Sequence, residues 1–139
     1  MRTTCGIVAA GVGLLCLAVP ALAHHGFDTE YDASKRVKLS GVVTQVAWTN
    51  PHMRVYVDVT GPDGKVTNWN LELTSPNTIR RQGWGPNDLK KGDKVTFEGF
   101  GGKVVETRGS LAMITKEGDD KPLFTAGGPE AGQSTPAPR

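Results

Sequence analysis

The chain has 139 residues, with 16 basic and 14 acidic side chains. This length suits one domain and is too short for two well-packed ones. Charges of both signs are interspersed, whereas proteins that bind nucleic acid usually carry a basic stripe. Length and charge therefore predict a single domain that does not bind nucleic acid.

The first 23 residues have the pattern of a secretory signal peptide. Arg2 precedes an uncharged apolar run over 6–19, and Pro20 and the triplet Ala21-Leu22-Ala23 follow it. A basic start, a short apolar stretch and small residues at the third and first positions before a cut are the parts of such a signal. The apolar run is shorter than the ~20 residues of a spanning helix. We expect a cleaved signal peptide over 1–23, a periplasmic or secreted protein and no stable membrane insertion afterwards. An uncleaved anchor is the alternative.

Cleavage removes every thiol from the chain. Cys5 and Cys16 both lie in the signal segment, and 139 − 23 = 116 residues remain. The mature domain then has neither a disulfide nor a cysteine–metal site, and its stability depends on its hydrophobic core. A chain of this size can bury such a core.

The mature chain begins with a polar stretch over 24–36, which we expect to form an extended or loosely turned N-terminal arm. Residues rich in Val, Thr and Leu then predict a long strand over 37–48, in which Gly41 marks a bulge or bend. Apolar and polar residues alternate over 53–60, which predicts a half-buried strand. The turn sequence Gly61-Pro62-Asp63-Gly64 predicts that this strand pairs as a hairpin with the next, over 66–74.

A short helix is predicted after the hairpin. Ser75 suits the N-cap, Pro76 the first helical position and Gly83 the end of the helix. Further strands are expected over 94–100 and 110–116, with a last short one near 123–124. We therefore expect a β-barrel domain over 37–124 and a disordered tail, rich in Gly, Pro, Ser and Ala, over 125–139.

The order of these elements predicts a mainly β fold. Five main strands, with one short helix between the third and the fourth, resemble the small five-stranded barrel that binds oligonucleotides or oligosaccharides, the OB fold. A β-sandwich is the alternative. Trp69 shares an apolar strand face and is expected in the core, while Trp48 and Trp84 flank turns and are expected to close the barrel ends.

His24 becomes the first residue of the mature chain if the signal is cut after Ala23. An N-terminal histidine offers two nitrogens to one metal ion, its α-amine and its ring Nδ1. One more imidazole completes a T-shaped set of three nitrogens, called a histidine brace. Such tetragonal, nitrogen-rich geometry suits Cu(II), and the donors must be unprotonated, so binding weakens as the pH falls. The sequence thus predicts a copper site at His24.

His52 is the natural third donor, because it lies after the Pro51 break at the start of a strand. His25 is a further metal-ligand candidate, and Met53 belongs to the apolar strand face and is expected in the core. The alternative is a solvated histidine pair at a flexible end, with His52 as an ordinary turn residue.

Carboxylates are candidates for orienting a histidine ring, which metal-bound imidazoles commonly require. The candidates are Asp28, Glu30, Asp32 and Glu72. Acidic residues spaced in this way more often form a solvated face, and we prefer that interpretation. We recognise no nucleophile motif and no phosphate-binding glycine loop, so nothing in the sequence supports a hydrolase or a nucleotide-dependent enzyme. We expect a binding protein rather than an enzyme, with an oxidative copper enzyme as the alternative.

Two histidine motifs resemble a known family. The run Ala23-His24-His25-Gly26-Phe27 with Tyr31-Asp32, and the run 46–52 ending in Asn50-Pro51-His52, are similar to those of small exported bacterial proteins known as domain of unknown function 6152. Serine is expected in the family at the position of Gly26. The resemblance covers most of 23–124 and implies export and a single small domain, but no activity.

Two functions follow as expectations. The first is an exported copper-binding protein for copper storage, buffering or delivery, with a metal ion and a possible envelope protein as partners. The second is an OB-like module that binds a small ligand, a glycan or a partner protein, with the histidines incidental.

Overall fold

The computed structural model describes residues 26–126, so His24, His25, the predicted signal peptide and the tail from 127 lie outside the described residues. Residues 26–30 are helical and belong to one unit of the chain. The strands belong to the other unit, which begins at Tyr31. Between residues 26 and 126 no helix is long and apolar enough to span a bilayer.

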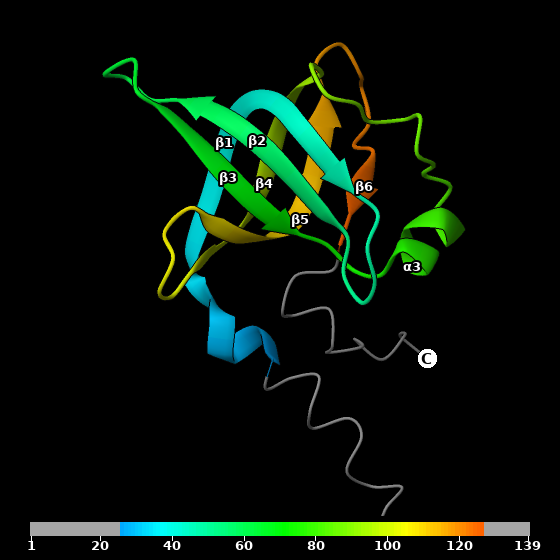
Figure 1. The fold of residues 1–139 in the computed structure, drawn as a ribbon, viewed down its shortest axis with the longest axis horizontal. Coiled ribbons are helices and arrows are strands. Elements are labelled where there is room, and N and C mark those ends of the chain that lie inside the picture. The colour runs from blue at the N-terminus through cyan, green and yellow to red at the C-terminus, as the bar shows by residue number, and fades with distance from the viewer. Residues whose placement is uncertain (1–25, 127–139) are drawn as a thin grey trace, which may run out of the picture. The chain divides into compact units, whose positions relative to one another are not determined.

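One sheet contains all six described strands (Figure 1). Their order is β3-β2-β1-β4-β5-β6, and an additional parallel pairing of β3 with β5 closes the sheet on itself. The strands are β1 (Tyr31–Ala47), β2 (Arg54–Thr60), β3 (Val66–Glu72), β4 (Lys94–Gly102), β5 (Arg108–Lys116) and β6 (Phe124–Thr125).

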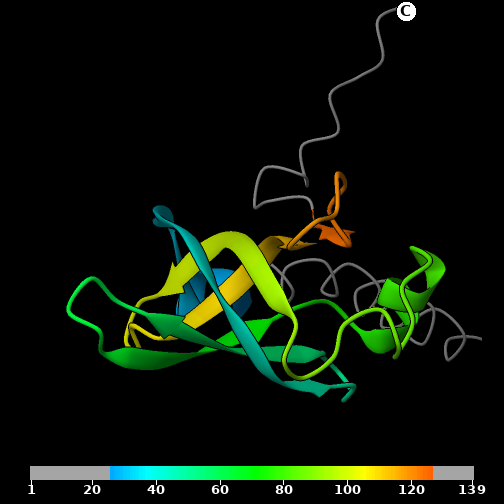
Figure 2. The same ribbon diagram turned by 90° about the horizontal axis from the view of Figure 1, so that it is seen from above.

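β1 joins the two halves of the barrel because it changes partners along its length. It pairs with β4 from Arg36 to Val42 and with β2 from Val42 to Ala47. Figure 2 shows the curved course of β1 and β4 around the barrel. β1 begins at Tyr31 rather than Val37, because Tyr31 already pairs with Gly102 of β4 across an irregular stretch of the register.

Gly41 has a different role from the predicted bulge. The register of β1 with β4 runs without a break through Gly41, and the irregularity of β1 lies between Val43 and Gln45. A Cβ at Gly41 would collide with the Asp58 carbonyl oxygen and with a Val57 methyl group. The glycine therefore allows β1 and β2 to approach closely where β1 changes partners.

The predicted helix is confirmed as α3 (Pro76–Arg81), between β3 and β4. The Ser75 hydroxyl accepts a hydrogen bond from the Thr78 backbone N–H, and Gly83 has a positive φ of 88°. Ile79 is fully buried, so this short helix is held mainly by its contact with the core.

The barrel interior is filled by side chains from every long strand and from the segment after α3. Phe97 lies fully buried near Trp69, with ring centroids 5.9 Å apart. Trp84 is 3% exposed and contacts Trp48 edge to face, so these two rings close one part of the core as expected. Met53 is fully buried, which confirms its assignment to the core.

The fold is mainly β and OB-like, as predicted from the order of elements. Five main strands close into a barrel, and β6 adds a sixth strand of two residues. Closure of one sheet on itself through β3 and β5 excludes the alternative of two separate stacked sheets.

Candidate functional site

His52 lies at the entrance to β2, in the turn that follows a cis Asn50-Pro51 peptide bond. The Thr49 hydroxyl donates a hydrogen bond of 3.1 Å to the His52 carbonyl oxygen. The next residue, Met53, is tied to the chain after β3 by two backbone hydrogen bonds of 3.1 and 2.9 Å. The His52 backbone is thus fixed on both sides, while its side chain is 52% exposed.

Glu72, the last residue of β3, contacts the His52 ring. Its Oε1 lies 2.5 Å from His52 Nδ1, and its side chain is only 13% exposed. A neutral imidazole that donates from Nδ1 keeps the lone pair of Nε2, on the other side of the ring. The contact therefore presents Nε2 of a half-exposed histidine as an available ligand nitrogen.

The second oxygen of Glu72, Oε2, accepts hydrogen bonds from three side chains. The donors are the Tyr31 hydroxyl at 2.8 Å, Arg54 Nη2 at 2.8 Å and Arg108 Nη2 at 3.3 Å. The Arg108 guanidinium also stacks over the Tyr31 ring, 5.9 Å from its centroid. We call Glu72, these three donors and His52 the Glu72 cluster.

The Glu72 cluster joins four strands, with Tyr31 in β1, Arg54 in β2, Glu72 in β3 and Arg108 in β5. Arg54 of β2 pairs with Glu72 of β3 in the sheet register, and Arg108 begins β5 beside Asn70 of β3. Arg54 Nη1 also donates a hydrogen bond of 3.1 Å to Asn70 Oδ1. The side chains therefore lie where β5 closes the barrel against β3.

The environment of Glu72 favours its ionised form. Burial alone would raise the pKa of this carboxyl, but the Tyr31 hydrogen bond and the positive charges of Arg54 and a protonated His52 outweigh burial. The pKa of Glu72 is therefore lowered. The same carboxylate and burial raise the pKa of the Tyr31 hydroxyl to about 12, with burial the larger cause.

The structure describes one of the three predicted metal ligands. His52 is placed as above, whereas His24 and His25 lie outside the described residues. Within residues 26–126, no three histidine, cysteine or acidic side chains gather in a group that could hold a metal ion. The chemistry of the described part is thus that of a single oriented imidazole beside a carboxylate and two guanidinium groups.

The preferred interpretation of Glu72 as a solvated carboxylate is wrong, because its carboxylate is mostly buried and contacts His52. Sequence reasoning did not single out Arg54 or Arg108. The alternation of apolar and polar residues in β2 and β3 put Arg54 and Glu72 on the polar faces of their strands. It did not show that the two residues pair, because the register between the strands cannot be read from either one. The parallel pairing that brings Arg108 to the cluster has no local signal in the sequence.

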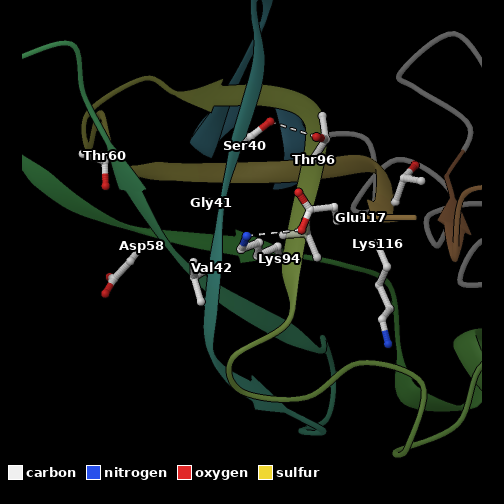
Figure 3. Close-up of a pocket in the computed structure, with 11 residues that line it drawn as sticks. Ser40, Gly41, Val42, Asp58, Thr60, Lys94, Thr96, Lys116 and Glu117 are labelled. Carbon is white, nitrogen blue, oxygen red and sulfur yellow. Dashed lines mark hydrogen bonds and ion pairs between the residues drawn. The ribbon is translucent and has the colours of Figure 1, made fainter. Parts of the chain in front are cut away.

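A separate pocket of about 380 Å³ is lined by residues of β1, β2, β4 and β5 (Figure 3). Ser40 and Thr96 share a hydrogen bond of 2.8 Å across it, and Lys94 and Glu117 form an ion pair of 3.5 Å (Figure 3). None of the Glu72 cluster lines this pocket. It is therefore a second candidate site, distinct from the oriented histidine.

Comparison with protein families assigns the sequence to one family. A model of the family of unknown function DUF6152 matches residues 10–111, which is most of the chain. The chain belongs to this family. No curated protein matches the sequence.

Among solved structures, the chain is similar to the mitochondrial single-stranded DNA binding protein Rim1 of S. cerevisiae in two crystal forms. The match to the first form has 12% sequence identity and a TM-score of 0.48, and it covers 63% of this chain and 97% of the Rim1 chain. The match to the second form has 12% sequence identity and a TM-score of 0.47, and it covers 60% of this chain and 93% of the Rim1 chain. The OB-like assignment rests on the strand order described above.

Proposed function

We propose that this member of DUF6152 is an exported copper-binding protein, periplasmic or secreted, that stores, buffers or delivers copper. Cu(II) is bound by the α-amine and ring of His24, which becomes the N-terminal residue after cleavage, and by His52 as the third nitrogen donor. His25 assists as a further ligand. Three nitrogen donors in a tetragonal set suit Cu(II) above the other divalent ions.

The orientation of His52 carries this proposal. Metal-bound imidazoles commonly donate their other ring N–H to a carboxylate, which fixes the tautomer and the direction of the ring. His52 has this arrangement with Glu72, at 2.5 Å, and its side chain is half-exposed. The alternative of an ordinary turn histidine does not account for this buried, ionised partner.

A Cu(II) titration of the mature protein, followed by electron paramagnetic resonance, tests the proposal. We expect cleavage after Ala23, verified by intact mass, and one tightly bound Cu(II) with a nitrogen-rich tetragonal signal. Affinity should fall as the pH falls, because the donors must lose their protons. A control chain with one extra residue before His24 should lose the tight site, since its terminal amine is displaced from the histidine.

The variant His52→Ala extends this test. Loss of a direct ligand should weaken Cu(II) binding by more than the roughly 10- to 100-fold that outer-shell partners contribute. Equal, weak binding by the mature protein, by the extended control and by His52→Ala would refute the brace. An uncut signal peptide would refute it as well.

The pocket of about 380 Å³ favours a second candidate function, a barrel module that binds a small ligand or glycan, or a partner protein. Its volume lies within the roughly 300–1,000 Å³ of small-molecule sites. A thermal-shift screen with disaccharides should then give a stabilisation that Thr96→Trp abolishes and His52→Ala leaves unchanged. No shift with any sugar would remove the glycan form of this alternative.

A further inference from the structure

We propose that Glu72 is the positioning residue of the metal site, and that it commits His52 to binding through Nε2. This inference rests on the proposed function, because it concerns how one of the proposed ligands is held. Glu72 itself does not bind the metal. It acts through the His52 ring.

The backbone of Glu72 is held from both sides. It pairs with Arg54 of β2 in the antiparallel register and with Ser110 of β5 in the parallel register. A residue between two strands moves only if the barrel opens at this point. The carboxylate is therefore carried by a backbone position that is paired on both sides and does not lie at a sheet edge.

The two oxygens of the Glu72 carboxylate have different partners. Oε2 accepts from Tyr31, Arg54 and Arg108, and Oε1 faces His52 Nδ1. Rotation of the carboxylate would break three hydrogen bonds at Oε2, two of them from charged groups, which are the stronger kind. Oε1 is thus held in a fixed direction, toward the imidazole.

The His52 ring has little else to direct it, since its side chain is 52% exposed against 13% for Glu72. The ordered carboxylate therefore selects the orientation and tautomer of the exposed ring. With the proton on Nδ1, the lone pair is on Nε2, and this nitrogen is the one a metal ion can take. Arg54, Arg108 and Tyr31 contribute indirectly, by holding Glu72.

The tautomer can be measured without copper. In the metal-free mature protein, ring ¹⁵N chemical shifts at a pH above the histidine range should show His52 protonated on Nδ1. The Nε2–H tautomer in the wild-type protein would overturn the inference. Because this measurement needs only the wild-type chain, it stands even if a Glu72 variant fails to fold.

Copper binding by Glu72→Gln provides the second test. We expect Cu(II) affinity, measured by chelator competition, to fall roughly 10- to 100-fold, with a nitrogen hyperfine pattern that shifts toward the pattern of His52→Ala. The matched control is Glu98→Gln, which removes a partly exposed glutamate paired with Lys38 at 2.8 Å and leaves histidine contacts intact. It should bind copper as the wild-type protein does.

The outcomes separate this inference from the proposed function. Unchanged affinity and an unchanged spectrum in a folded Glu72→Gln, together with binding that still requires His52, would overturn the positioning role alone. Failure of the wild-type protein to bind Cu(II) tightly through His52 would overturn the proposed function and this inference with it.

Discussion

The Tyr31 hydroxyl links the first residue of β1 to the outer end of β3. It donates a hydrogen bond of 2.8 Å to Glu72 Oε2, and the tyrosine is only 4% exposed. Burial, followed by the hydrogen bond to the carboxylate and its negative charge, raises the pKa of the phenol from 10.0 to about 12. The folded protein therefore favours the neutral phenol.

The titration of Tyr31 should affect stability at alkaline pH. Because the folded pKa lies above the unfolded one, its contribution is complete below about pH 10 and is lost as the pH rises through about 12. Phenolate absorbance during an alkaline titration should show a late phase near pH 12. Tyr31→Phe should remove this phase, while Tyr56→Phe should keep it. A late phase that persists in Tyr31→Phe would contradict the assignment.

At the scale of single residues, the sequence allowed His52 to be predicted as a candidate but not its partners. The Pro51 break and the following strand placed the histidine at a rigid position. Which carboxylate would face it depends on the pairing of Arg54 with Glu72, and that register has no signature within either strand. Whether Glu72 orients a histidine ring or belongs to a solvated face therefore depends on the tertiary structure.

Among the elements, β1 and β2 depend on the absence of a side chain at Gly41. A Cβ there would meet the Asp58 carbonyl oxygen and a Val57 methyl group. Backbone and a buried valine cannot move aside without shifting β2, because Val57 is fully buried. Glycine is thus required at position 41 because a side chain would not fit between the strands, and not because the backbone has an unusual conformation there.

Gly41→Ala should destabilise the barrel by roughly 1–3 kcal/mol, the usual cost of overpacking. Urea denaturation measures this change in the free energy of unfolding. Gly85→Ala is the matched control, since an added Cβ would meet only Asp88 Oδ2 at the ordinary contact distance of 3.7 Å. It should stay within about 0.5 kcal/mol of the wild-type protein. Equal stability of the two variants would show that β1 and β2 can separate without cost.

Elements with local signals were predicted more accurately than those without. Ser75, Pro76 and Gly83 marked the helix, and alternation marked β2 and β3. The start of β1 at Tyr31 was not predicted, because residues 32–35 include no large apolar side chain and are mostly exposed. The pairs Tyr31–Gly102 and Arg36–Phe100 with β4 enclose this segment, and the register between them is irregular.

The whole barrel is organised around a core that the strands share. Phe97 of β4 is 0% exposed, and the centroid of its ring lies 5.9 Å from that of Trp69 of β3. Phe97→Ala should lower the free energy of unfolding by roughly 3–5 kcal/mol, a large share of the roughly 5–15 kcal/mol of an average domain. Thermal and urea unfolding test this. Val66→Ala, at a residue 55% exposed, should change stability by less than about 0.5 kcal/mol.

At the scale of the molecule, the element order predicted the fold class, but closure could only be inferred. The hairpin of β2 and β3 follows from the turn at 61–64, because the two strands are adjacent in sequence. The pairing of β3 with β5 joins segments separated by α3 and β4, so it depends on the complete fold. The Glu72 cluster also depends on the complete fold, because Arg108 contacts Glu72 only once β5 has paired with β3.

The short parallel seam between β3 and β5, together with the β1–β4 pairing, also limits how quickly the barrel can form. Asn70 and Arg108 are 108 − 70 = 38 residues apart, and Val37 and Gly99 of the β1–β4 pairing are 99 − 37 = 62 apart. Chains dominated by such distant contacts fold in milliseconds to seconds, far more slowly than helical bundles. Until the seam closes, the edges of β3 and β5 present unpaired backbone groups that can recruit strands of other chains. The folding rate, and not only the stability of the native barrel, therefore sets its exposure to aggregation.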